Sequence, residues 1–127
     1  GWKGAIGGVT DRTIAAMQAL GARPERIAAA IGPCIGQASY EVDEIFRSRF
    51  IADDSANGRF SATGRERHWR FALAGYVAAR LAAGGIGQVQ SLGLDTYSAP
   101  ERFFSFRRAT HHNHPNYGRQ ISLIGLA

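Results

Sequence analysis

The stretch RIAAAIGPCIG, residues 26–36, points to the fold class of this chain. It is a short apolar run that ends at the pair Gly32-Pro33. Apolar runs of this length, bounded by turn residues, are typical of buried β-strands, so we predict a strand that leads into a turn. Helical patterns lie on both sides of it in the sequence, which places the strand in a protein that alternates helices and strands.

The two flanking segments have the spacing of amphipathic helices. Before the strand, apolar residues recur every three or four positions and predict a helix that ends at Gly21. After it, residues 40–50 (YEVDEIFRSRF) repeat the spacing and predict a second, short helix. The apolar positions of the first helix are Ile6, Val9, Thr13, Met17 and Leu20.

The second half of the chain continues the alternation. Residues 52–62 are polar and contain glycine, which predicts a surface loop. Thr63 and Glu66 match a capping box, and we predict that the helix behind them runs to Gly84-Gly85. Residues 86–94 and 120–126 are predicted strands, the second of them central in a sheet. The chain therefore belongs to the α/β or α+β class. The apolar residues that predict the helix behind Thr63 are Trp69, Leu73, Tyr76, Val77 and Leu81.

Length and charge limit the candidate functions. With 127 residues and no linker or repeat, the chain forms at most one domain. It carries a net charge of +5, and its cations are fourteen arginines and one lysine, which favours an anionic partner bound by guanidinium groups over a generic nucleic-acid surface. The alternative is that the excess charge is solvated surface. Arg102, Arg107, Arg108 and Arg119 crowd the C-terminal quarter.

No apolar run is long enough to cross a membrane, so a cytoplasmic protein is expected.

Two motifs near the N-terminus carry candidate chemistry. Gly1-Trp2-Lys3-Gly4 has the ingredients of an anion site at a helix start, although it matches neither standard nucleotide-binding loop and a tight turn is the plainer interpretation. Cys34 follows a Gly-Pro turn and is the only cysteine. It is either a nucleophile with a histidine base nearby or, more simply, a small buried apolar side chain.

Two further motifs lie near the C-terminus. The loop THHNHPNYGR brings His111, His112 and His114 together, but neighbours in an extended segment point to opposite sides and no carboxylate accompanies them, so we do not expect a native metal site there. The stretch FFSFRR, residues 103–108, is predicted to be an extended strand with aromatic side chains. There Arg107 and Arg108 would bind an anion while Phe104 stacks on a planar ring. The alternative is an aromatic core strand with a solvated arginine pair.

Four motifs in register resemble one known family. Gly-Trp-Lys-Gly, then AIGPCIGQASYEVDEIF, LDTYSAPERFFSFRR and YGRQISLIGL, are similar in this order to the second half of the YfiH-type laccase-domain family. Members of that family are described as multicopper polyphenol oxidases and as purine nucleoside phosphorylases with zinc at the active site. The resemblance implies an α/β domain with a mixed central sheet flanked by helices, of which residues 1–127 would be the C-terminal part.

The resemblance also implies where the metal is bound. The family's pattern reads His-Ala-Gly-Trp-Arg-Gly, and that histidine is a metal ligand, as are a histidine and a cysteine further upstream. The ligands are thus expected before Gly1, Cys34 is a different cysteine, and the 127 residues alone are expected to be inactive. Lys3 replaces the more common arginine, which keeps the charge but loses the bidentate fork.

The activity that the resemblance implies is zinc-dependent phosphorolysis of purine nucleosides such as adenosine, inosine and methylthioadenosine, with adenosine deamination as an additional candidate. Inorganic phosphate and the nucleoside are then the partners. A copper-dependent polyphenol oxidase and a basic nucleic-acid-binding domain are the alternatives. The preferred nucleoside, and the choice between monomer and homodimer, stay open. The candidate substrate-binding residues are Trp2, Lys3, Gly4, Tyr40, Phe104, Arg107 and Arg108.

Overall fold

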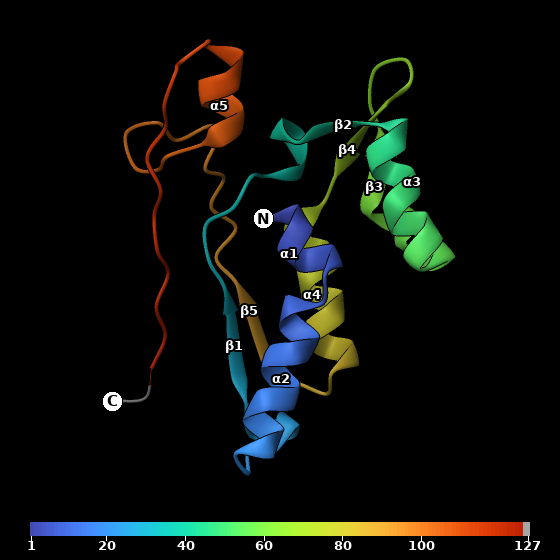
Figure 1. Ribbon diagram of the computed structural model, residues 1–127, viewed down its shortest axis with the longest axis vertical. Helices are drawn as coiled ribbons and strands as arrows, with labels where there is room; N and C mark the ends of the chain where they lie inside the picture. Colours follow the sequence, from blue (N-terminus) through green and yellow to red (C-terminus); the bar gives the residue numbers. More distant parts are fainter. Residues whose placement is uncertain (126–127) are drawn as a thin grey trace.

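The computed structural model describes residues 1–125, and its helices and strands alternate along the chain (Figure 1). Five α-helices, three 3₁₀ turns and five strands are present in these residues. In order they are α1 (Trp2–Ile6), α2 (Val9–Ala19), η1 (Pro24–Arg26), β1 (Ala28–Ile31), η2 (Gln37–Ser39), β2 (Glu41–Asp43), α3 (Glu44–Asp53), η3 (Ser55–Phe60), β3 (Ser61–Thr63), β4 (His68–Phe71), α4 (Leu73–Ala83), β5 (Gln88–Ser91) and α5 (Phe106–His111).

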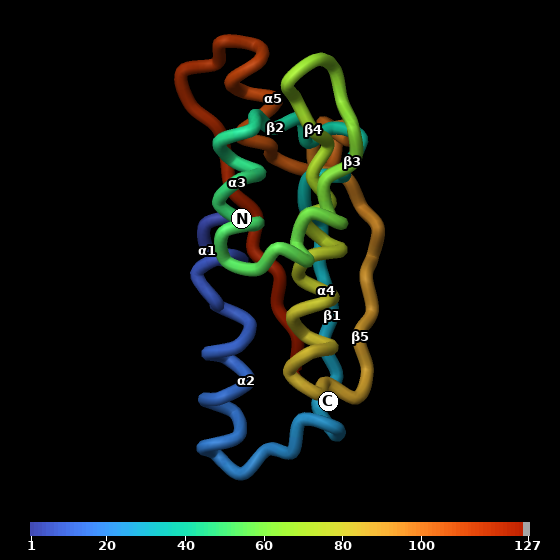
Figure 2. The backbone as a smooth tube through the Cα atoms, turned by 90° about the vertical axis from the view of Figure 1, so that its right-hand side faces the viewer, coloured from blue at the N-terminus to red at the C-terminus, as the bar shows by residue number. Residues whose placement is uncertain are grey.

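The strands form two small sheets. β1 pairs with β5 in parallel, from Ala28 opposite Gln88 to Ile31 opposite Ser91. β4 lies between β2 and β3 in an antiparallel sheet. The α/β class is therefore confirmed, with parallel and antiparallel pairing both present. Helix α4 lies between α2 and the parallel pair (Figure 2), and it contacts all three.

An aromatic core joins the antiparallel sheet to the helices. Phe50 on α3 packs against Phe71 at the end of β4, with 4.4 Å between ring centroids, and edge-on against Tyr76 of α4 at 5.0 Å. All three side chains are almost fully buried. Aromatic pairs in these geometries stabilise a core by about 0.5–1.5 kcal/mol beyond the burial of their surface. This core fixes the position of the neighbouring Tyr40, which follows η2 and lies 6.1 Å from Phe71.

Three predicted elements are confirmed, with bounds that differ slightly. Helix α2 ends at Ala19, just before Gly21, β1 occupies the centre of residues 26–36, and β5 lies within residues 86–94. Ile14 of α2 and Ile31 of β1 are buried, whereas Val9 and Leu20 are exposed and β5 has no buried residue, so the apolar pattern matches burial only in part.

The prediction of a helix beginning at Thr63 is wrong. Thr63 ends β3, and a turn joins it to β4, in which Trp69 lies. The turn is closed by a hydrogen bond from Gly64 N to His68 O and by a left-handed backbone at Arg67 (φ 59°). Pairing of β3 with β4 therefore overrides the capping-box signal, and α4 begins only at Leu73.

Two neighbouring predictions also need correction. The segment predicted as a helix over residues 40–50 begins with strand β2, and the helix starts only after Asp43, whose carboxylate accepts a hydrogen bond from Phe46 N at 2.7 Å. The predicted loop over residues 52–62 is instead the end of α3 followed by η3 and β3. Its ordering is due to Asn57 and Phe60, which are buried, with the Asn57 amide donating to Phe50 O at 3.0 Å.

The predicted strand over residues 120–126 is not formed by residues 120–125, and Leu126 lies outside the described residues. Residues 117–125, which we call the C-terminal segment, run beside β1 without ladder hydrogen bonds to it (Figures 1 and 2). Ile121 and Leu123 on the segment are more than 80% exposed. The apolar pattern that suggested a central strand is therefore not buried within residues 1–125. In the same residues no helix is both long and apolar enough to cross a membrane.

Candidate functional site

A pocket of about 460 Å³ lies where the start of α1, the loop after β1, the start of α5 and the C-terminal segment converge. Its size falls within the usual range for small-molecule sites. We call it the aromatic pocket because five aromatic residues line it, namely Trp2, Tyr40, Phe104, Phe106 and Tyr117. The pocket contains four of the seven candidate substrate-binding residues: Trp2, Tyr40, Phe104 and Arg107.

Trp2 stands at the pocket end of α1. Its ring meets Phe46 of α3 edge-on, with 5.1 Å between centroids. Two cations lie near the same ring, with Lys3 Nζ at 5.8 Å and the Arg49 guanidinium carbon at 5.4 Å from its centroid. The indole is thus held by aromatic and cation–π contacts. Lys3 and Gly4 themselves line a separate shallow depression beside Arg12 and not the aromatic pocket.

Tyr40 forms a buried wall of the pocket. Only 6% of the residue is exposed, and its ring meets Phe46 and Phe71 edge-on. Burial raises the pKa of its hydroxyl to about 12, although the nearby charge of Arg107 opposes the shift. The hydroxyl therefore stays protonated near neutral pH and can donate a hydrogen bond to a ligand.

Arg107 reaches the pocket from the first turn of α5. Its guanidinium carbon lies 5.2 Å from the centroid of the Tyr40 ring, and its Nη1 donates to Glu41 O at 2.5 Å. The remaining N–H groups form no hydrogen bond within the described residues, so they are available to an anion in the pocket.

The prediction of an extended strand over residues 103–108 is wrong, since residues 103–105 form no strand and a helix follows them. Ser105 caps α5, its hydroxyl accepting a hydrogen bond from Arg108 N at 3.3 Å, and Phe106 begins the helix. Phe104 precedes the cap and is 54% exposed. Its ring lies so close to Gly118 that a Cβ built on that glycine would be 2.5 Å from a ring carbon. The cap starts α5, and Arg107 in its first turn lies over the Tyr40 ring.

Arg108 does not line the aromatic pocket. Its guanidinium donates to Thr96 O at 2.6 Å, to Tyr97 O at 2.9 Å and to Phe103 O. It therefore ties α5 to both ends of the preceding loop, and its donors are used by backbone carbonyls. Two neighbouring arginines in one motif have different environments: Arg107 faces the pocket, and Arg108 holds the backbone behind it.

Asp95 is a second anchoring residue, and the sequence patterns did not single it out. One of its oxygens accepts hydrogen bonds from Gly36 N at 2.9 Å and Tyr97 N at 2.8 Å, and the other accepts from the Ser39 hydroxyl at 2.6 Å. Partial burial raises its pKa, but these hydrogen bonds outweigh burial, and the net pKa lies below its usual value. The signal that could have found it is an aspartate directly after the predicted strand over residues 86–94, because aspartates in turns accept hydrogen bonds from the backbone two positions on.

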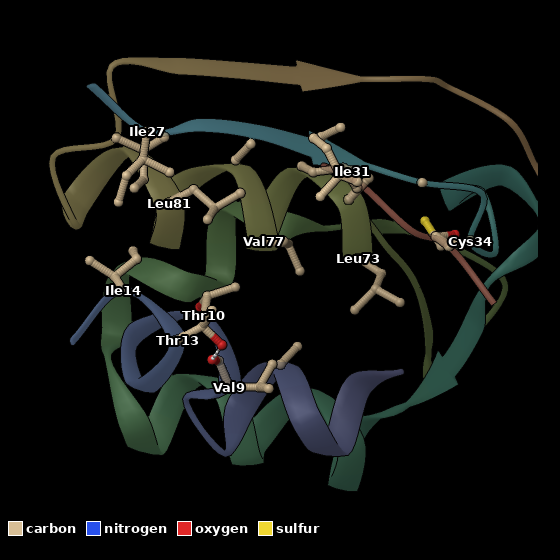
Figure 3. A pocket seen from close by; sticks show the side chains of 18 of the residues that line it. Val9, Thr10, Thr13, Ile14, Ile27, Ile31, Cys34, Leu73, Val77 and Leu81 are labelled. Atoms are coloured by element: carbon tan, nitrogen blue, oxygen red, sulfur yellow. Dashed lines mark hydrogen bonds between the residues drawn. The ribbon is translucent and has the colours of Figure 1, made fainter. Parts of the chain in front are cut away.

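A second cavity of about 500 Å³ lies between α2, α4 and β1 (Figure 3). The side chains that line it are almost all aliphatic, with Ile14, Ile31 and Val77 among them, and none carries a charge. Thr10 and Thr13 supply its few polar atoms on the α2 side. Because it offers no charged or aromatic group, this groove does not match the anion and planar-ring chemistry expected from the sequence.

A family model described as multi-copper polyphenol oxidoreductase laccase matches residues 1–127. The chain belongs to this family. Among the curated relatives of this laccase-like family, a protein of Rickettsia prowazekii named purine nucleoside phosphorylase is 33% identical over 98% of this chain and 51% of its own length. One of Deinococcus radiodurans with the same name is 37% identical over 99% of this chain and 46% of its own length. The chain therefore spans about half the length of these relatives.

Solved structures of this laccase-like family agree with the fold. A Neisseria meningitidis protein superposes with a TM-score of 0.77 at 27% identity, covering 85% of this chain and 43% of that chain. A Bacillus licheniformis hypothetical protein, YfiH, superposes with a TM-score of 0.76 at 29% identity, covering 87% of this chain and 43% of its own. The YfiH-type resemblance inferred from the four sequence motifs is thus confirmed.

The metal implied by the family does not fit the residues described here. Within residues 1–125 no group of three or more His, Cys, Asp or Glu side chains is placed to hold a metal ion. His111 is bonded through Nδ1 to the Tyr97 hydroxyl at 2.9 Å, and the rings of His112 and His114 lie 5.6 Å apart. Burial, helped by the charge of Asp95, raises the pKa of the Cys34 thiol, which keeps this cysteine protonated near neutral pH. Neither motif offers a ready zinc site or an activated thiol.

Proposed function

We propose that the aromatic pocket binds the nucleoside and phosphate in a zinc-dependent purine nucleoside phosphorylase. The observation that carries the proposal is the convergence of Trp2, Tyr40, Phe104 and Arg107, which come from α1, the loop before β2, the segment before α5 and α5 itself, on one pocket. No aspartate or glutamate is found among the described residues that line it. The relatives named purine nucleoside phosphorylase support the same activity.

Three residues of the pocket can serve the steps of phosphorolysis. An oxygen of inorganic phosphate attacks C1′ of the ribose, the bond between C1′ and the purine nitrogen breaks with its electron pair on the purine, and the purine takes up a proton. Arg107 would hold the phosphate through charge-assisted hydrogen bonds. Phe104 would stack on the purine, and the protonated Tyr40 hydroxyl would donate to the substrate. Adenosine, inosine and methylthioadenosine are the proposed substrates, with adenosine deamination as an additional activity.

Zinc, when bound, would activate a water molecule or polarise a substrate oxygen. Under the proposal its ligands come from residues before Gly1, as the resemblance to the family implies, and residues 1–125 contain no group of three or more candidate ligands. Residues 1–127 then form the C-terminal part of a single domain and are inactive by themselves.

A copper-dependent polyphenol oxidase is the second candidate, because the description of the matching family model names that chemistry. Metal analysis of the full natural protein, combined with oxygen uptake in the presence of a phenol, distinguishes the two activities. Stoichiometric copper with phenol-dependent oxygen uptake and no phosphorolysis would establish the oxidase.

The test of the phosphorylase uses the full natural protein with inosine and phosphate, and it follows the release of hypoxanthine. We expect Arg107→Ala to raise the KM for phosphate or lower kcat/KM by about 10- to 100-fold, because it removes a charge-assisted hydrogen bond. Arg107→Lys keeps the charge and should retain part of the activity.

Arg102→Ala is the matched control, since it removes an equal charge from an exposed arginine five positions away that does not line the pocket. Circular dichroism and thermal unfolding show whether each variant is folded. If folded Arg107→Ala protein turns inosine over like the wild type, the role given to this pocket is wrong.

A further inference from the structure

We propose that Arg119 is a second phosphate-binding residue of the aromatic pocket and works with Arg107, an inference that rests on the proposed phosphorolysis. The two arginines come from different elements, α5 and the C-terminal segment, and both line the same pocket. Arg119 is one of the four arginines of the C-terminal quarter, and no sequence motif marked it as a site residue.

The charge of this pocket is not neutralised by neighbouring acids. The described residues that line it include the two arginines and no carboxylate. Neither Arg107 nor Arg119 takes part in the ion pairs found within residues 1–125. Two guanidinium groups without counter-charges in a partly enclosed space favour an anionic ligand.

The donors of Arg119 are also free for a ligand. Its guanidinium carbon lies 4.9 Å from the centroid of the Tyr117 ring, and its one hydrogen bond within the described residues is a long contact of 3.4 Å from Nη2 to the Tyr117 hydroxyl. Stacking on an aromatic ring orients a guanidinium and leaves its in-plane N–H groups available. Arg107 is held on Tyr40 in the same manner.

The backbone that carries Arg119 is fixed on both sides of the residue. On its C-terminal side, the Gln120 side chain forms two hydrogen bonds with the Phe104 backbone. Its Oε1 accepts from Phe104 N at 3.0 Å, and its Nε2 donates to Phe104 O at 3.3 Å. On its N-terminal side, Gly118 lies against the Phe104 ring. The segment is thus attached at Phe104, and the position of Arg119 relative to the pocket follows from that attachment.

The chemistry assigns Arg119 to phosphate and not to the nucleoside. A neutral nucleoside has no charge to balance two guanidinium groups, whereas phosphate near neutral pH carries one to two negative charges and accepts from several donors at once. Two arginines from different segments would also orient an oxygen of the phosphate toward the ribose.

The experiment compares Arg119→Ala, Arg119→Lys and Arg26→Ala in the full natural protein. Arg26→Ala is the control, because it removes an exposed arginine that does not line this pocket. Initial rates are measured while phosphate and inosine are varied separately, and binding of inorganic phosphate is measured by calorimetry without nucleoside. We expect Arg119→Ala to raise the KM and the dissociation constant for phosphate by about 10- to 100-fold, with the KM for inosine changed by less than about threefold.

The outcomes separate this inference from the proposed function. If the wild type phosphorolyses inosine and Arg119→Ala leaves both phosphate constants unchanged, or raises only the KM for inosine, Arg119 is not a phosphate ligand although the function stands. If the wild type shows no phosphorolysis with any purine nucleoside, the proposed function fails. Calorimetry then still decides whether Arg119 binds phosphate. Arg119→Lys should fall between the wild type and the alanine variant.

Discussion

Single residues outside the substrate contacts determine the shape of the pocket. Asp95 holds the loop after β1 by accepting from Gly36 and Ser39, while Arg108 holds the loop after β5 by donating to Thr96, Tyr97 and Phe103. The walls formed by Ile35 and Thr96 depend on these two side chains, so neither needs to touch substrate to affect binding.

Asp95→Asn is predicted to destabilise the protein by about 1–3 kcal/mol at pH 7, because it replaces charge-assisted hydrogen bonds by weaker neutral ones. The folded pKa of Asp95 lies below its unfolded value, so its contribution is fully present above the unfolded pKa of about 3.9 and is lost as the pH falls through the folded pKa. The difference between wild type and variant should therefore shrink below about pH 4.

Urea unfolding at several pH values measures this difference. Asp53→Asn is the control, since Asp53 is exposed and forms no side-chain hydrogen bond within the described residues. Equal midpoints for the wild type and Asp95→Asn at pH 7 would contradict the anchoring role.

At the scale of elements, the C-terminal segment packs closely against the pocket wall at Gly118. Any Cβ on Gly118 would lie about 2.5–2.6 Å from three carbons of the Phe104 ring, well inside normal contact. Glycine is therefore required at this position, because any side chain would collide with the Phe104 ring.

Gly118→Ala is expected to displace the Phe104 ring or the segment, raise the KM for both substrates severalfold and cost about 1–3 kcal/mol of stability, as overpacking does. Steady-state kinetics and thermal unfolding measure the two effects. Gly125→Ala on the same segment is the control, because nothing lies within 4 Å of a Cβ there. If Gly118→Ala and Gly125→Ala give the same KM values and the same stability, the close approach at Gly118 does not affect function.

The elements that could be predicted from sequence are those whose signal is local. Helix α2 and strand β1 follow directly from apolar spacing and end at glycine. The hairpin of β3 and β4 was not predicted, because the spacing of apolar residues shows neither which strands pair nor that the Arg67 backbone is left-handed.

The same distinction holds for the site. Residue type and motif selected Trp2, Tyr40, Phe104 and Arg107, which line one pocket. They also selected Lys3, Gly4 and Arg108, which lie outside it. Asp95 and Arg119 were not selected, because the hydrogen bonds of Asp95 and the place of Arg119 in the pocket arise only when distant segments meet.

At the scale of the whole molecule, the C-terminal quarter of the chain carries an excess of positive charge, and two of its arginines, Arg107 and Arg119, line the aromatic pocket. After Asp95 the chain contains four arginines and a single acid, Glu101. The field at the pocket is therefore expected to attract phosphate over distances comparable with the Debye length of about 10 Å at 0.1 M salt.

Raising the salt concentration from about 0.02 M to 0.5 M should consequently weaken phosphate binding severalfold and leave the KM of the neutral nucleoside nearly unchanged. Sodium chloride titrations of both KM values measure this. A control series with glycerol in place of salt excludes general solvent effects. Equal changes in the two constants would show that the charge does not act on phosphate.

The hydrogen bond between Gly36 and Asp95 links residues 59 positions apart, and the parallel pairing of β1 with β5 is equally remote in sequence. The antiparallel sheet, in contrast, is assembled from neighbouring segments. Because long loops are costly to close, the sheet and its aromatic core are expected to fold early and the β1–β5 pair late. The aromatic pocket combines Tyr40 from the early part with Thr96 from the late part, so the binding site would be completed only in the last steps of folding.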